Sequence, residues 1–297
     1  MRCRSFVMFM ALLLSGCQGS LPEEAALCGS SGSLRVGYVG AAEGQVLDTT
    51  QVISDTDQER MRTLMTVAGR CDVEFEPLLS PERARLRLQQ GHWDLAFLPP
   101  GLTALAMQRG VDGQPVRSLT RRNASRSAVL VAAGSPIQSL QDLNNQRLGL
   151  LPRGSLTGFY LPLYNLHGLR LNEVRYAISY RALLELLRAG DVDAIAWDVG
   201  LPSPGADVRV LLEDSRDIPA GAMVLSQSLV NADHKSLLAT LDSSAAEMPE
   251  ELGYASAVLP NPQDYQALKD IVSHVEGWTL PEEGRPYNVF GSTAVVP

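Results

Sequence analysis

Short apolar segments alternate with amphipathic helical segments along most of this chain, and this alternation is the strongest constraint on its fold. Residues 33–40 are typical of a buried strand, and residues 57–69 carry apolar side chains at helical spacing. A second strand-like segment, DVEFEPLL, and a second helical segment, SPERARLRLQQG, follow in the same order. Strands separated by helices in this way predict βαβ units and a parallel sheet.

The two halves of the chain also share a local pattern, RLQQGHWDLAF at 87–97 and LLRAGDVDAIA at 186–196. Each combines the end of a helix, a glycine, two further residues, an aspartate and a buried strand. We interpret the pattern as two similar α/β lobes, and the alternative is chance similarity between two α/β units. The predicted division places residues 33–130 and 220–297 in the first lobe and residues 131–219 in the second.

The N-terminal stretch, MRCRSFVMFMALLLSGC, has two arginines and then an apolar core that is too short to be a comfortable membrane span. It predicts a signal peptide over residues 1–16. Its end, LSGC, is similar to the bacterial lipobox, which implies cleavage before Cys17, lipidation of Cys17, and a lipid anchor and tether over residues 17–32. The alternative is an ordinary secretion signal that happens to end near a cysteine.

Two cysteines, Cys28 and Cys71, remain after the signal peptide and the lipidation site are set aside. Outside the cytoplasm an even number of cysteines favours disulfide formation. Each of the two precedes a strand-like segment, so parallel neighbouring strands would bring both to the same end of a sheet. We predict a disulfide between them, and the alternative is two separate buried thiols.

Composition and motifs exclude several classes of function. The net charge is −8 and no basic run stands out, which argues against nucleic-acid binding. The histidines are scattered without the paired spacing of a metal site, and neither a nucleophile elbow nor a P-loop is present. We therefore expect no metal, no cofactor and no catalytic residue, and an enzyme is the weakest of the candidate functions.

The segment LPRGSLTGFYLP, residues 151–162, places small and hydroxyl-bearing residues where a strand leads into a helix. Pro162 lacks an N–H, so the helix cannot begin much before Thr157 without losing an internal hydrogen bond. The free amides and the positive dipole end of a helix start bind anions. Glycines let the backbone approach a ligand, and hydroxyls add donors. The residues concerned are Gly154, Ser155, Thr157 and Gly158. The alternative is an ordinary N-cap.

The chain resembles the type II periplasmic binding proteins of ABC transporters, in their phosphate- and phosphonate-binding (PhnD-like) branch. The matching segments run in order from about residue 34 to residue 228: LRVGYVG, LQQGHWDLAFLPPG, SAVLVAAGSPIQSLQDLNNQRLGLL, GSLTGFYLP, LLELLRAGDVDAIAWD and IPAGAMVLS. The resemblance implies an α/β fold of two lobes joined by a two-strand hinge, which closes on a small solute. It also implies an ABC permease as partner, at the periplasmic or extracellular face of the membrane.

The resemblance places the ligand loop at Ser155-Leu156-Thr157-Gly158, where the family reads roughly Ser-Thr-Ser-Gly and holds phosphonate oxygens. Leu156 therefore removes one donor. Tyr180 stands where a histidine is common, and Leu98 or Pro99 stands where a tyrosine is frequent. The remaining residues of the predicted ligand set are Gly40, Gly154 and Asp198.

Two further residues carry open interpretations. Arg153 is predicted either as a charged partner for an oxyanion or as a solvated loop charge. Trp197 is predicted either as an aromatic that stacks on the ligand or, in view of its apolar strand, as a core residue.

Two functions follow from this interpretation. The first is a transport receptor that binds a small oxyanion-bearing solute, similar to phosphate or a phosphonate, and delivers it to a permease. The second is a sensor on the same fold that presents the solute to a signalling partner.

Overall fold

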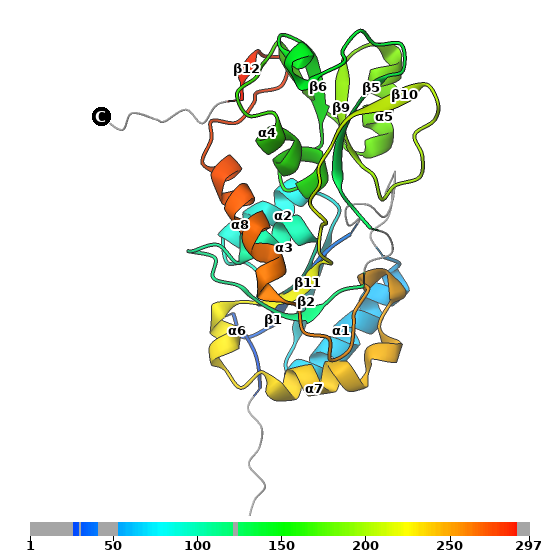
Figure 1. Ribbon diagram of the computed structural model, residues 1–297. Helices are drawn as coiled ribbons and strands as arrows, with labels where there is room; N and C mark the ends of the chain where they lie inside the picture. Colours follow the sequence, from blue (N-terminus) through cyan, green and yellow to red (C-terminus); the bar gives the residue numbers. More distant parts are fainter. Residues whose placement is uncertain (1–25, 30, 41–52, 121–123, 290–297) are drawn as a thin grey trace, which may run out of the picture.

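The computed structural model describes residues 26–29, 31–40, 53–120 and 124–289. The predicted signal peptide and the lipidation site Cys17 lie outside the described residues. The described strands form two five-stranded sheets and one two-stranded ribbon. Figure 1 shows the two larger sheets in separate lobes, one below the other. Every helix among the described residues is too short or too polar to cross a bilayer.

The first sheet has the strand order β2-β1-β3-β11-β4. Strand β1 pairs in parallel with β2 and β3, whereas β11 runs antiparallel to β3 and β4. The predicted βαβ units are therefore confirmed. The elements are β1 (Leu34–Val39), α1 (Asp55–Gly69), β2 (Val73–Leu78), α2 (Pro81–Gln89), β3 (Leu95–Leu98), α3 (Pro100–Ala106), β4 (Gln114–Ser118), β11 (Ala222–Leu225), α6 (Gln227–Asn231), α7 (Lys235–Ser243), the 3-10 turns η3 (Ala245–Glu247) and η4 (Glu250–Leu252), and α8 (Pro262–Glu276).

The second sheet has the strand order β10-β5-β9-β6-β8. Strand β6 is parallel to β8 and β9, and β5 is antiparallel to β9 and β10. The elements are β5 (Ser127–Ala132), the 3-10 turn η1 (Leu140–Leu143), β6 (Arg147–Leu150), the π-helical turn η2 (Leu156–Tyr160), α4 (Leu161–Asn165), β7 (Arg170–Leu171), β8 (Glu173–Tyr176), α5 (Tyr180–Ala189), β9 (Ala194–Asp198), β10 (Val208–Glu213) and β12 (Tyr287–Asn288).

The chain passes between the two sheets three times. It crosses from β4 to β5, returns from β10 to β11, and crosses again through α8 to β12, which pairs with β7. Helix α8 packs on α3 and also contacts α4 and η2, so it connects the two lobes (Figure 1). The lobe boundaries stay a prediction. Strand β5, which belongs wholly to the second sheet, begins at Ser127, before the predicted boundary at residue 131, and β12, within the range 220–297 predicted for the first lobe, pairs with β7 of the second.

Apolar packing continues from one lobe into the other. A single cluster of buried side chains includes Leu98 and Leu102 of the first lobe, Leu156 and Leu161 of the second, and Val272 of α8. Burying this surface removes apolar area from water, which is the main favourable term in folding. The lobes therefore meet through a packed interface beside the ends of β3 and β6.

Capping explains where the helices of the repeated pattern begin and end. Ser179 is the N-cap of α5 and accepts a hydrogen bond from the Ala182 amide, and Gly190 ends the helix in the left-handed region at φ 73°. In the first lobe Ser80 caps α2 in the same way, with Pro81 at the first helical position.

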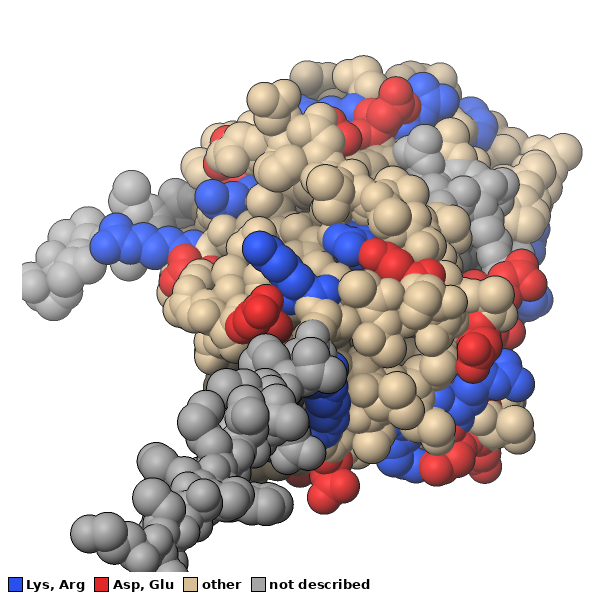
Figure 2. All heavy atoms as spheres, turned by 90° about the horizontal axis from the view of Figure 1, so that it is seen from below, with Lys and Arg blue, Asp and Glu red and all other residues tan. Residues whose placement is uncertain are grey.

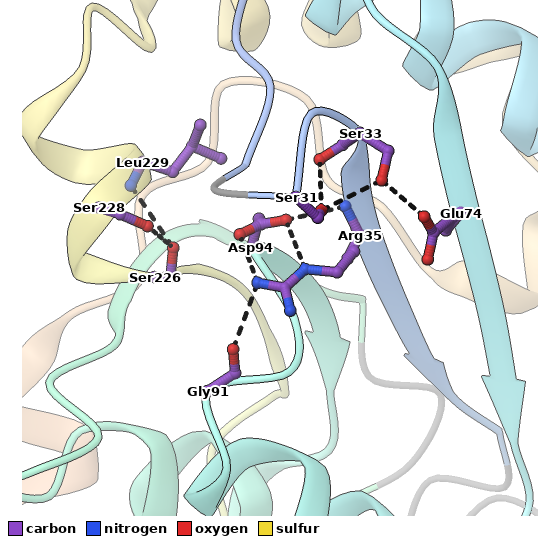
Figure 3. A network of polar contacts seen from close by, with 9 residues as sticks. All are labelled: Ser31, Ser33, Arg35, Glu74, Gly91, Asp94, Ser226, Ser228 and Leu229. Carbon is purple, nitrogen blue, oxygen red and sulfur yellow. Dashed lines mark hydrogen bonds and ion pairs between the residues drawn. The ribbon is translucent and has the colours of Figure 1, made fainter.

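In both lobes the aspartate of the repeated pattern binds an arginine on the neighbouring parallel strand. Asp94 accepts from the backbone amide of Arg35 at 2.9 Å and from its guanidinium at 3.1 and 3.0 Å (Figure 3). Asp193 accepts from the backbone amide of Arg147 at 2.8 Å and from its guanidinium at 3.0 and 2.7 Å. Each arginine lies at the start of the neighbouring parallel strand. The common geometry confirms that the two lobes share one plan.

Cys28 and Cys71 lie at the same end of the first sheet, as predicted, and the structure has both as half-buried free thiols. The Leu27 amide donates to the Gly69 carbonyl at 2.8 Å, which brings the two segments together. Burial, followed by the neighbouring Cys28 thiol, raises the pKa of Cys71 to about 12. The thiols are therefore neighbours rather than separate, and their disulfide stays a prediction.

Charges of both signs lie interspersed on the face of the molecule seen in Figure 2. Elsewhere on the surface, Arg60 and Asp57 of α1 pair at 3.0 Å. Such exposed pairs contribute little to stability, so these surface charges serve solubility more than folding.

Candidate functional site

The candidate site lies where strands of the second sheet end toward the first lobe. Strands β6, β8 and β9 are parallel, so their carboxyl ends share one edge of the sheet. The predicted ligand loop follows β6, Tyr180 follows β8, and Asp198 ends β9. Ligands of open α/β sheets bind at such an edge.

The structure brings two predicted hydroxyl-bearing residues, Thr157 and Tyr180, close to the carboxylate of a third, Asp198. The Thr157 hydroxyl donates to Asp198 Oδ2 at 3.1 Å, and the Thr157 and Tyr180 hydroxyls lie 2.5 Å apart. The Gly200 amide donates to Asp198 Oδ1 at 2.8 Å. Asp198 has no exposed surface, and burial raises the pKa of its carboxyl group. Its partners in this cluster are hydroxyls and an amide, all of them neutral.

A third hydroxyl comes from Ser125, which is not among the predicted site residues. Ser125 donates to Asp198 Oδ2 at 2.5 Å and is itself buried. It reaches the cluster because β5 runs antiparallel to β9, which sets Ser127 opposite Asp198. The sequence signal for Ser125 is a pair of serines, Ser125 and Ser127, at the start of an apolar strand. That signal identifies a site residue only when β5 is known to lie beside β9. We define the hydroxyl cluster as Ser125, Thr157, Tyr180 and Asp198.

The ligand loop begins with a π-helical turn rather than with an α-helix. Ser155 is the N-cap, and its hydroxyl accepts from the Gly158 amide at 3.1 Å. The Tyr160 amide donates to the Ser155 carbonyl at 3.1 Å, which is the five-residue spacing of a π turn. The capping interpretation is therefore observed for Ser155, while its contact with a ligand stays a prediction.

The glycines of the loop allow close approach to other parts of the protein. Gly154 has φ 109°, and a side chain there would meet the Pro81 carbonyl oxygen at 2.6 Å. A side chain at Gly158 would meet Leu151 at the same distance. Leu156 is fully buried against Gly101, at the start of α3. The loop is thus seated on the first lobe, and a role for these residues toward a ligand stays a prediction.

Arg153 pairs with a carboxylate of the protein itself. Its Nε donates to Glu276 Oε1 at 2.7 Å, and its terminal nitrogen donates to the other oxygen of the same carboxylate. The side chain is half-buried, so the interpretation as a solvated loop charge is wrong. A direct contact between Arg153 and an oxyanion stays a prediction.

The other predicted residues lie at the strand ends or in the core. Gly40 and Pro99 follow β1 and β3, and both are buried. Leu98 ends β3 with no exposed surface. Trp197 is buried beside Tyr180, with ring centroids 5.6 Å apart, so it is a core residue. Among the residues that the structure describes, no group of histidine, cysteine and acidic side chains is arranged to hold a metal ion.

Comparison with known proteins gives one family and several structures. A family model described as "ABC transporter, phosphonate, periplasmic substrate-binding protein" matches residues 49–265. Among the curated proteins no match was found.

Three solved structures show the same fold at low sequence identity. XAC2383 from Xanthomonas citri, bound to chloride ion, is 16% identical with a TM-score of 0.63, over 82% of this chain and 98% of that one. PhnD1 from Prochlorococcus marinus, in complex with methylphosphonate, is 15% identical with a TM-score of 0.56, over 82% and 98%. The ABC phosphonate transporter component PA3383 from Pseudomonas aeruginosa is 13% identical with a TM-score of 0.56, over 82% and 87%. The predicted two-lobed α/β fold of type II is confirmed.

Proposed function

Because the chain belongs to the family of periplasmic substrate-binding proteins of ABC phosphonate transporters, we propose that it binds a small oxyanion-bearing solute between its lobes and delivers it to an ABC permease. The family is one of binding proteins, not of enzymes. Phosphate, phosphite and phosphonates are the solutes that we favour. Binding would work by closure of the lobes, biased by contacts that only the closed state makes.

The hydroxyl cluster is the observation that supports this proposal. The hydroxyls of Ser125 and Thr157 donate to one buried carboxylate, and the Tyr180 hydroxyl contacts that of Thr157, at the sheet edge where such folds bind ligands. Hydroxyls can rotate to donate to a ligand oxygen or to accept from one. The Ser125 and Thr157 hydroxyls can therefore exchange a bond to Asp198 for a bond to a solute without leaving their places.

The buried carboxylate also bears on the charge of the solute. A negative charge placed beside ionised Asp198 is repelled strongly in a site without water. The repulsion is removed if one proton is shared, either on the carboxyl group, whose pKa burial raises, or on the solute. We therefore expect a proton-bearing oxyanion, such as hydrogen phosphate or a phosphonate monoanion, to bind better than sulfate.

Thermal unfolding of the purified protein tests this proposal with a panel of solutes. Phosphate, phosphite and methylphosphonate are compared with sulfate, a sulfonate and an amino acid. A solute at 100 times its Kd stabilises by about 2.7 kcal/mol, which is easily measured as a shift in Tm. A flat response to every oxyanion, together with a shift for a neutral solute, would contradict the proposal.

Thr157 provides the sharpest test of the site itself. Thr157→Ala removes the hydroxyl that touches both Asp198 and Tyr180, whereas Thr157→Ser keeps it. We expect the alanine variant to weaken the best solute much more than it lowers unfolding stability, and the serine variant to bind nearly as wild type. Equal losses of binding and stability would favour a purely structural role.

The lipid anchor is a separate proposal, supported by the lipobox-like sequence that ends at Cys17. Mass spectrometry of the mature N-terminus would detect acyl chains on that residue. Cys17→Ala should release the protein from membranes. A mature wild-type chain without acyl groups would overturn this proposal and leave the solute-binding proposal standing.

The Cys28–Cys71 disulfide is also kept as a proposal, since the two thiols are neighbours. Oxidation by a disulfide-bearing oxidant would join the sulfurs and pass two electrons and two protons to the oxidant. Thiol labelling of protein isolated without reductant should find neither cysteine reactive. Complete labelling of both after unfolding would show that they remain thiols.

A further inference from the structure

We propose that Glu276, the last residue of α8, is a positioning residue that holds both ends of the ligand loop in place; this inference rests on the proposed function of that loop. Glu276 is 119 positions beyond Thr157 in the sequence (276 − 157), and no pattern singled it out. Its role follows from three contacts made by one carboxylate.

The first two contacts hold the two ends of the loop. Arg153, just before Gly154, donates to both oxygens of Glu276, with Nε at 2.7 Å from Oε1. The hydroxyl of Tyr160, at the end of the π turn, donates to Oε1 at 2.5 Å. Burial, and then the Glu276 charge, raise the pKa of Tyr160 well above its ordinary value, so the hydroxyl remains a donor. One carboxylate thus closes the loop from residue 153 to residue 160.

The third contact comes from the first lobe. Arg85 of α2 lies with a terminal nitrogen 3.6 Å from Glu276 Oε2 and is almost completely buried. Its other contacts hold it firmly, because it donates to Glu82 at 2.9 Å and to Gln89 at 2.6 Å. The same helix begins at Pro81, whose carbonyl faces Gly154. Glu276 therefore joins the loop to the lobe on which the loop is seated.

Burial makes these contacts strong. The Glu276 side chain is 11% exposed, so water screens its charge poorly. Hydrogen bonds between ions are shorter and stronger than those between neutral groups, and an arginine that binds both carboxylate oxygens is also fixed in orientation. One buried arginine, Arg85, and one half-buried arginine, Arg153, leave the Glu276 carboxylate little freedom to move.

Thr157 lies between the two ends that Glu276 holds. Its hydroxyl must stay within hydrogen-bond reach of Asp198 and Tyr180 at once, so a small displacement of the loop breaks at least one contact. Glu276 makes its bonds to Arg153, Tyr160 and Arg85, and it acts on Thr157 only through them. Affinity for the solute should therefore depend on a side chain that need not touch the solute.

The test uses Glu276→Gln in the full chain, which keeps the shape of the side chain and removes its charge. Binding of inorganic phosphate and of methylphosphonate is measured by calorimetry. We expect affinity to fall about tenfold or more. Glu282→Gln is the matched control, because Glu282 is exposed and pairs with exposed Arg285, and the affinity of this variant should equal that of wild type.

Tyr160→Phe provides a second variant that removes one hydroxyl only. We expect a smaller loss of affinity, of about threefold, because Arg153 and Arg85 still hold the Glu276 carboxylate. It tests the inference even if Glu276→Gln folds poorly. A combined Arg153→Gln and Glu276→Gln variant should bind no worse than Glu276→Gln alone, because the two residues act through one contact.

Hydrogen exchange supplies a measurement that needs no solute. In Glu276→Gln the amides of residues 154–160 should exchange faster than in wild type and in Glu282→Gln, while those of β1 and β9 should not change. Unchanged exchange at residues 154–160, or wild-type affinity in both Glu276→Gln and Tyr160→Phe, overturns the role of Glu276 and leaves the proposed function standing. A wild-type protein that binds neither probe overturns the proposed function, and exchange then still decides whether Glu276 holds the loop.

Discussion

The first lobe buries its arginine–aspartate pair much more deeply than the second. The side chain of Asp94 is 3% exposed and that of its partner Arg35 is 18% exposed, whereas the values for Asp193 and Arg147 are 25% and 32%. The hydrogen bonds between arginine and aspartate are equivalent in the two lobes. The same short pattern therefore builds one contact in two different surroundings.

A segment remote from the pattern accounts for the burial in the first lobe. Gly29 passes so close to Asp94 that a side chain there would lie 2.2 Å from Oδ2. Covering an ion pair removes screening by water, so the same geometry has a larger energetic effect when it is buried. The local sequence thus determines which arginine and aspartate pair. The chain segment that covers the pair determines how much the pair contributes to folding stability.

The largest expected effect is that of Asp94→Asn. It leaves the half-buried Arg35 without its charged partner, and breaking a pair whose carboxylate is buried costs about 3 kcal/mol. Urea unfolding of the purified variant near neutral pH measures the change in the free energy of unfolding. A loss well below 1 kcal/mol would mean that coverage does not strengthen the pair.

Gly29→Ala should have the next largest effect. The added methyl group cannot fit beside Asp94, which three hydrogen bonds hold in place, so the covering segment must move away. We expect a loss of about 2 kcal/mol in unfolding stability, as for other overpacked sites. Gly134→Ala is the control, since a side chain there would meet open space. Equal effects of both variants would contradict the role assigned to Gly29.

Asp193→Asn should be milder than either first-lobe variant. Water reaches this pair, so the arginine left behind can be solvated and the expected loss is about 1 kcal/mol. The same urea titration measures it. If Asp193→Asn costs as much as Asp94→Asn, the difference in burial between the lobes has no energetic consequence.

The smallest effect is a dependence on pH in the second lobe. Hydrogen bonds from Arg147 hold the pKa of Asp193 below its usual value of 3.8. A carboxyl group with a lowered pKa in the folded state contributes stability that is present above 3.8 and is lost as the pH falls through the folded pKa. The stability gap between wild type and Asp193→Asn should therefore shrink on acidification. A gap that widened in acid would contradict this sign.

The candidate site was predicted in part. Thr157, Tyr180 and Asp198 follow strands that the alternation of the sequence identified, and parallel strands bring their ends together whatever their exact neighbours are. Ser125 and Glu276 were missed. Ser125 joins the site through antiparallel pairing of β5 with β9, and Glu276 joins it through a helix that crosses between the lobes. Neither the β5–β9 pairing nor the crossing helix produces a recognisable sequence pattern near Ser125 or Glu276.

Local interactions settle much of this protein without reference to distant residues. Helix caps such as Ser80 and Ser179, the spacing of apolar side chains and the repeated aspartate all act within a few positions along the chain, so they can be inferred from the order of residues alone. Burial is different. Gly29 covers Asp94, and the Glu276 carboxylate at the end of α8 binds both ends of the ligand loop. Both contacts depend on which segments lie side by side after folding. The strength of a charge pair depends on how far water is kept from it. The contacts between distant segments therefore decide how much each ion pair contributes to folding stability.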